Sequence, residues 1–192
     1  MTTPLPGVAG LYQAFDAEFP PSEIPAGCAA VLGYTSGQRA ANIWAPRQWL
    51  PFAGIRQFPC HVPDFGAEDP VSSARTAVQA ALNLGWAAGM PERRVIVCDA
   101  ETLTDPEWYA EFANEVDMEE FTSVLYGSIG NALLNAASDL WVADWGVPTM
   151  PDGQTIHAAQ IIAGVPFGGT LVDYSVIDHW MLARGGVGPR HV

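Results

Sequence analysis

Four carboxylate residues stand at or just beyond the ends of apolar, strand-like runs: Asp16, Asp99, Glu101 and Asp173. Asp99 and Glu101 are two residues apart, so on an extended strand both side chains would point to the same face, roughly 6.5 Å apart along the chain. Facing one cavity, such carboxylates would repel one another, and with partial burial this raises at least one pKa. A protonated acid beside ionised partners is the arrangement that cleavage of a glycosidic bond needs.

Each carboxylate, taken alone, also has a simpler interpretation. An Asp after a strand is most often a helix cap or a turn residue, so the hypothesis depends on the four together. Metal chemistry finds less support, because the four histidines are scattered and no HxH or HExxH motif occurs. His61 and Asp64 could pair on a metal, but a surface or hydrogen-bonded histidine is the simpler interpretation. We therefore expect no metal and no cofactor.

The elements that must position these residues alternate along the chain. Strands are predicted at 11–15, 28–34, 55–62, 94–98, 123–126, 140–143, 157–162 and 170–172. Helices are predicted at 71–88 and 129–137, and a further one carries the stripe from Trp108 to Val116, with Thr104 and Glu107 as a capping box. Because the strand-like runs are apolar rather than alternating, they indicate strands buried on both faces, as in a parallel sheet covered by helices.

About eight such strands suggest a closed α/β barrel, in which a site lies at the C-terminal ends of the strands. The chain is short of the roughly 250 residues typical of a full barrel, and no convincing helix is predicted after Ala143. We therefore expect a trimmed TIM-like (β/α) barrel with reduced helices after the later strands. A doubly wound open sheet is the alternative, although the Gly-rich phosphate loop that such sheets usually carry is missing from the sequence.

Composition narrows the class of protein further. The chain has 192 residues, 49% of them hydrophobic and 15% charged, which predicts one folded domain over 1–192 with flexible ends at 1–10 and 185–192. A net charge of −13 argues against nucleic acid and anionic lipid as partners. No apolar stretch reaches the length of a membrane span, and no signal peptide pattern is present. The three cysteines are widely spaced, so we expect buried free thiols.

Six segments, in order, carry a resemblance to a known family. They are LYQAFDAE at 11–18, VIVCDAE at 95–101, SVLYGS at 123–128, LWVADWG at 140–146, HAAQI at 157–161 and GTLVDYSVID at 169–178. Together they resemble glycoside hydrolase family 25, the lysozyme-like muramidases, and the related glycoside-hydrolase-like domains of actinobacteria and their phages. The resemblance covers about residues 11–182.

The resemblance implies a role for each candidate residue. Glu101 would be the general acid that protonates the glycosidic oxygen. Asp99 would hold the water or the substrate acetamido group, or stabilise the oxocarbenium-like transition state. Asp16 and Asp173 would set the field around Glu101 and hydrogen-bond the sugar. The groove would be lined by Tyr126, Trp141 and Gln160.

The chain also departs from the family pattern. Ala17 and Glu18 follow the first-strand Asp where the family usually has Val and Ser, and Ile161 stands where it usually has Tyr. Trp44 and Trp49 have no obvious counterpart in the family. These departures point to the divergent glycoside-hydrolase-like branch and bear on the substrate more than on the fold.

Two functions follow from these patterns. The first is a glycoside hydrolase that cleaves a cell-wall glycan of the peptidoglycan type, with cell-wall polysaccharide as its partner. The alternative is a catalytically inactive glycan-binding or structural module of a phage tail or wall-associated assembly. Since no signal peptide is predicted, we expect the protein to be made in the cytoplasm and to act at the wall after release by another route, or as part of a virion, with virion or lysis proteins as partners.

Overall fold

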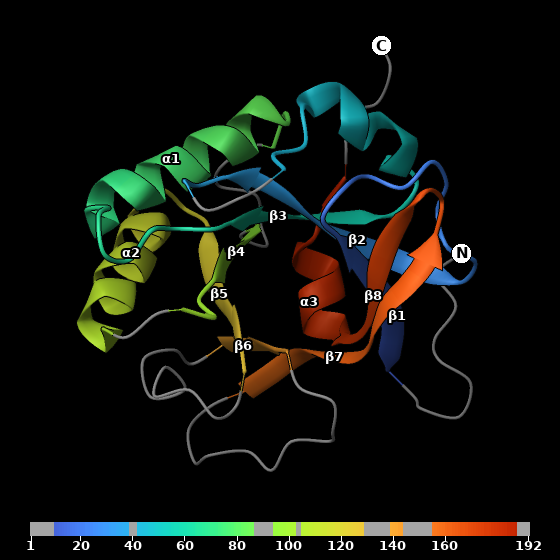
Figure 1. Cartoon of the computed structure of the whole chain (residues 1–192). Coiled ribbons are helices and arrows are strands. Elements are labelled where there is room, and N and C mark those ends of the chain that lie inside the picture. Colours follow the sequence, from blue (N-terminus) through green and yellow to red (C-terminus); the bar gives the residue numbers. More distant parts are fainter. Residues whose placement is uncertain are drawn as a thin grey trace.

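The computed structural model describes residues 10–38, 42–86, 94–102, 105–128, 139–143 and 155–187. Within them, eight strands close into a barrel, since β1 pairs with β8 and β2 pairs with β3 (Figure 1). The strands are β1 Leu11–Ala17, β2 Cys28–Ser36, β3 Arg56–His61, β4 Val95–Asp99, β5 Thr122–Gly127, β6 Asp139–Val142, β7 Thr155–Phe167 and β8 Thr170–Asp178. The trimmed TIM-like barrel is confirmed, and closure excludes the open-sheet alternative.

The last strand of the barrel runs against the others. β1 to β7 are parallel to their neighbours in sequence, whereas β8 is antiparallel to both β7 and β1. The prediction that Asp173 ends a strand over 170–172 is therefore wrong: β8 continues to Asp178, and Asp173 lies near its start. Because β8 is reversed, its start lies at the same end of the barrel as the C-terminal ends of the other strands. Asp173 thus reaches the predicted place by a different route.

Two helices cover one side of the barrel, α1 Pro70–Asn83 and α2 Pro106–Met118 (Figure 1). α1 begins at the N-cap Asp69, whose side chain accepts from Ser72 N, and it ends earlier than the predicted 88. The capping box at Thr104 is wrong, because the N-cap of α2 is Asp105, which accepts a hydrogen bond from Glu107 N. Thr104 itself and the predicted helix at 129–137 lie outside the described residues.

A short helix, α3 His179–Arg184, follows β8 where no helix was expected. Asp178 caps it by accepting from Met181 N, 2.8 Å away. Figure 1 shows α3 in the middle of the ring of strands, and its buried Met181 and Leu182 belong to the apolar cluster inside the barrel. The helix therefore closes the end of the barrel opposite to the C-terminal ends of the parallel strands.

The start of the predicted flexible C-terminal end is held against the barrel. The two-residue strand β9, Gly186–Val187, pairs with β3, and Gly185 O accepts from Arg94 Nη1 at 2.9 Å.

A 3-10 helix, η1 Pro46–Phe52, buries Trp49 and Phe52 against the outside of the sheet. Among the described segments, no helix is both long and apolar enough to cross a membrane.

The barrel wall separates two apolar layers because side chains alternate along each strand. The outer layer packs under the helices and contains Phe15, Val31, Ile96, Cys98 and Leu125. The inner layer contains residues from every barrel strand, among them Ala14, Leu32, Phe58, Val97, Val124, Trp141, Ala158 and Ile177. All three cysteines are buried and free, as predicted. At the C-terminal end of the parallel strands, the residues that face into the barrel are polar instead of apolar.

Candidate active site

The polar end of the inward row brings the predicted carboxylates together. Asp16 is the penultimate residue of β1, and it is paired in register with Asp173 directly across on β8. Asp99 is the last residue of β4, and Glu101 lies exposed in the turn beyond it. The charges of Asp173, Asp99 and Glu101 all act on Asp16, so the four groups share one end of the barrel.

The environment of Asp16 is unfavourable for a negative charge. Its pKa is raised well above the ordinary value, first by burial and then by the charges of Asp173, Asp99 and Glu101. The side chain is only 8% exposed, and its Oδ2 has no hydrogen-bond partner among the described residues. The predicted raised pKa in the cluster therefore falls on Asp16, below the mouth, whereas Glu101 stands at the exposed rim.

Asp173 is held in place by a short hydrogen-bond network. Gln160 Nε2 donates to its Oδ2 at 2.7 Å, and Gly164 N donates to its Oδ1 at 2.6 Å. Tyr126 in turn donates from its hydroxyl to Gln160 Oε1 at 3.0 Å. The Gly164 contact depends on irregular register between β7 and β8 after Gln160 and on the positive φ of Gly164, 68°. Both oxygens of Asp173 thus act as acceptors, and buried Gln160 links it to Tyr126.

The geometry of Asp99 and Glu101 differs from the extended strand assumed above. β4 stops at Asp99, whose Oδ1 accepts a hydrogen bond from Glu101 N at 3.2 Å. This is the turn that an Asp side chain commonly forms with the backbone two residues on, and it ends the strand before Glu101. The two carboxylates nevertheless reach the same mouth, because the charges of both raise the pKa of Tyr126 in the site.

Aromatic side chains form the wall and floor between the carboxylates. Tyr126 on β5 lies beside Asp99 in register and packs edge-on to Trp141, with ring centroids 6.4 Å apart. Trp141 is 0% exposed, and its Nε1 donates to Ser175 Oγ at 3.1 Å. It therefore lies beneath the site as a floor and offers no open face to a ligand.

One site residue was missed by the sequence reasoning. Tyr34 lies on β2, and its pKa is raised by burial first and then by the charges of Cys60, Asp99, Asp16 and Glu101. These influences place its hydroxyl among the carboxylates. Its signal in the sequence is the alternation that carries Ala30 and Leu32 into the barrel and makes Tyr34 the next inward position.

His61 has its hydrogen bonds satisfied within the protein. Its Nδ1 lies 2.8 Å from Ser36 Oγ and its Nε2 lies 2.6 Å from Ser73 Oγ, while the ring stacks on Phe112. Burial lowers its pKa to about 4. The structure thus agrees with the hydrogen-bonded interpretation of His61. In the part of the chain that the structure describes, no group of three or more His, Cys, Asp or Glu residues could hold a metal ion.

No family model matches the sequence, and no curated protein matches it. Several solved structures share the fold. A bacterial lysozyme from Streptomyces coelicolor is 21% identical and matches over 90% of this chain and 96% of its own, with a TM-score of 0.65. The muramidase from Acremonium alcalophilum is 18% identical over 83% of this chain and 89% of its own, with a TM-score of 0.62. The Tat-secreted protein Rv2525c from Mycobacterium tuberculosis, in complex with L-tartrate, is 16% identical over 86% of this chain and 94% of its own, with a TM-score of 0.60.

The chain shares its trimmed TIM-like barrel fold with this lysozyme and this muramidase. At these identities the likeness concerns the fold, and the function has to be argued from the site itself.

Proposed function

We propose that the protein is a glycoside hydrolase that cleaves a cell-wall glycan of the peptidoglycan type at this site. The observation that carries the proposal is the gathering of Asp16, Asp99, Glu101 and Asp173 at one end of the barrel, with Asp16 buried and paired across the sheet with Asp173. Two carboxyl groups in unlike environments are what acid-catalysed glycosidic cleavage uses. The lysozyme and the muramidase that share the fold support the same substrate class.

The proposed roles follow the placement of each group. Glu101, exposed at the rim, protonates the oxygen of the leaving sugar as the general acid. Asp99 is fixed next to it by the turn hydrogen bond and holds the acetamido group or the attacking water, or stabilises the positive charge that develops on the sugar ring. The assignment of these roles agrees with the family 25 resemblance of VIVCDAE at 95–101.

Asp16 and Asp173 act from inside the barrel, below Glu101 and Asp99. Asp173 is a fixed acceptor for sugar hydroxyls, because Gln160 and Gly164 hold both of its oxygens. A protonated Asp16 lowers the negative charge of the cluster by one and supplies an O–H donor. Tyr126 and Gln160 complete the side of the site. The proposed place of action is the cell wall, where this polymer lies.

The test is release of soluble fragments from purified actinobacterial and other Gram-positive cell walls. Wild type should lower the turbidity of the suspension, and Glu101→Gln should lose that activity. Glu111→Gln, on the exposed face of α2, changes the same side-chain type away from the site and should behave as wild type. If no wall is cleaved while wild type and Glu101→Gln bind glycan equally, the hydrolase proposal fails and the alternative holds, a glycan-binding module of a wall or virion assembly.

A further inference from the structure

A groove lies beside the carboxylates, between the segment after β1 and the tip of the β7–β8 hairpin. Its volume is about 680 Å³, within the range of roughly 300–1,000 Å³ typical of small-molecule sites. Its lining includes Glu18, Phe19, Pro166, Phe167, Thr170 and Leu171. Phe19 is 51% exposed and is one of the large hydrophobic residues that the fold leaves open to solvent.

Both walls of the groove are fixed by contacts within the protein. At the hairpin tip, Gly168 O accepts from Ser22 N at 3.0 Å, and a Cβ on Gly168 would lie 2.8 Å from Pro21 Cβ. On the other wall, Glu18 Oε1 accepts from Asn42 Nδ2 at 2.8 Å, and the backbone oxygen of Glu18 accepts from Trp44 Nε1 at 3.2 Å. The groove is therefore formed before any ligand arrives, as small-molecule sites usually are.

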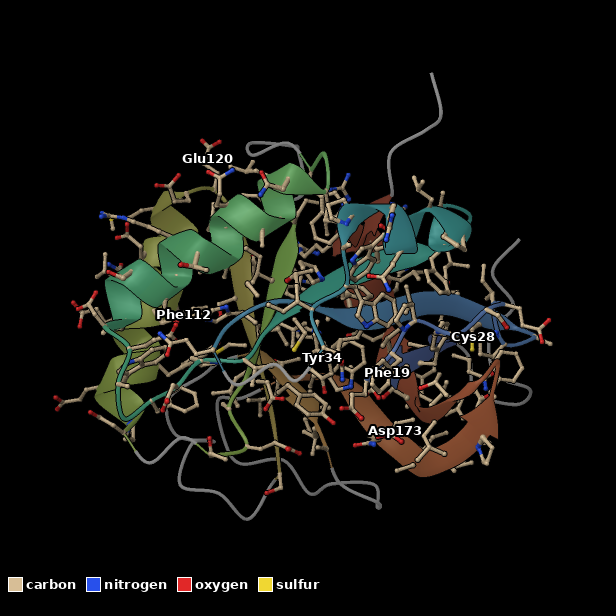
Figure 2. The ribbon with its side chains drawn as sticks, turned by 45° about the horizontal axis from the view of Figure 1, so that its top comes forward. Phe19, Cys28, Tyr34, Phe112, Glu120 and Asp173 are labelled. Carbon is tan, nitrogen blue, oxygen red and sulfur yellow. The ribbon has the colours of Figure 1, made fainter. Side chains whose placement is uncertain are left out.

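The groove lies beyond Asp16 and Asp173 along the paired strands β1 and β8. Glu18 lies two residues beyond Asp16 on one wall, and Leu171 lies two residues before Asp173 on the other, and β1 and β8 are paired in register. At about 3.3 Å per residue, two positions carry the groove roughly 7 Å beyond the carboxylates. In Figure 2, Phe19 lies next to the hairpin that carries Asp173.

We propose that this groove binds a further sugar of the same N-acetylated glycan chain, with the sugar ring stacked on Phe19. The apolar C–H face of a sugar packs on the open aromatic ring and on Leu171, and the fixed carboxylate of Glu18 accepts hydrogen bonds from sugar hydroxyls. This inference rests on the proposed glycan substrate. Phe19 is a binding residue in it and takes no part in bond cleavage.

The test is calorimetric titration with N-acetylated chitotetraose and with chitobiose, in a Glu101→Gln background so that neither sugar is consumed. Phe19→Ala should weaken binding of the tetrasaccharide about tenfold, which corresponds to about 1.4 kcal/mol. It should leave the disaccharide within twofold, because a short chain at the carboxylates does not reach the groove. Phe19→Tyr keeps the ring and should restore the affinity for the tetrasaccharide.

The matched control is Met118→Ala, which truncates a 62% exposed side chain at the end of α2, outside the groove. Its affinity should equal that of the background protein. Tetrasaccharide binding that is unchanged in Phe19→Ala, an equal loss with both sugars, or no binding of either sugar would overturn the inference.

The two proposals fail separately in this design. If wild type cleaves no cell wall but the tetrasaccharide still depends on Phe19, the hydrolase proposal fails and the sugar-binding groove is supported. If the cell walls are cleaved and the affinity for the tetrasaccharide does not depend on Phe19, only the groove proposal fails.

Discussion

Acidification from pH 7 to pH 4.5 should destabilise the protein through His61. The ring is 0% exposed, its two nitrogens are satisfied by Ser36 and Ser73, and burial lowers its pKa from 6.5 to about 4. Because the folded pKa lies below the unfolded one, the stabilisation is complete above pH 6.5 and is lost as the pH falls through 4. Between pH 6.5 and about 4, the unfolded chain binds a proton at His61 that the folded protein does not bind.

The magnitude follows from the size of the pKa shift. At about 1.36 kcal/mol per pKa unit, the displacement from 6.5 to about 4 limits the loss to about 3 kcal/mol, of which about 2 kcal/mol is lost by pH 4.5. Other groups also titrate in this range, so the quantity to measure is the difference between wild type and His61→Gln. Glutamine keeps an amide for hydrogen bonding but does not titrate.

The assay is urea unfolding of both proteins at several pH values between 7 and 4.5, followed by tryptophan fluorescence. Wild type should lose about 2 kcal/mol more than His61→Gln over this range. The same substitution at His179, which is exposed on α3, is the control and should leave the acid-dependent loss as it is in wild type. Parallel loss of stability in wild type and His61→Gln would refute the reasoning.

Three further predictions concern the barrel and its mouth. His157, hydrogen-bonded to Asp139 and Asp178, has a pKa of about 9, because these partners outweigh the lowering effect of burial. The stabilisation by His157 is present below pH 6.5 and is lost as the pH rises through 9. After allowance for its partly exposed partners, urea unfolding should show a loss of up to about 2 kcal/mol by pH 9.5. His157→Gln should not show this loss. Asp16→Asn should raise the urea midpoint at pH 7, since it removes a buried carboxyl group; an unchanged midpoint would contradict the assigned burial cost. Gln160→Ala should lower kcat on the order of 100-fold with little change in KM, because it frees Asp173 and Tyr126 from their link; an effect on KM alone would show that Gln160 contacts only the bound sugar.

Much of the fold was predictable because local patterns report it directly. Apolar runs bounded by turn residues located all eight barrel strands within a few residues, apart from the length of β7 and β8. The reversed direction of β8 was not recognised, although the sequence carried its signal: Gly168 and Gly169, both at positive φ, form the tight turn of a hairpin. Taken as a hairpin, 155–178 would have predicted an antiparallel strand and Asp173 near its start.

The candidate site could be predicted only in part. Asp16 and Asp99 could be placed at one end of a barrel because their distance from the strand ends is a local property. Asp173 lies at that end for a different reason, because β8 is antiparallel and Asp173 is near its start. The links among Tyr126, Gln160 and Asp173 join residues on three strands, and no local pattern reports such contacts. The same holds for Asp16 as the carboxyl with the raised pKa, because burial depends on every strand around it.

The most direct test of the central claim is to count the new sugar reducing ends formed when purified cell walls are digested. Fragments would be reduced with borohydride and identified by mass spectrometry, for wild type and Glu101→Gln side by side. We expect new reducing ends on an N-acetylated sugar with wild type and none with Glu101→Gln. Fragments with intact glycan chains and broken peptide bonds, or equal numbers of new reducing ends from both proteins, would contradict it.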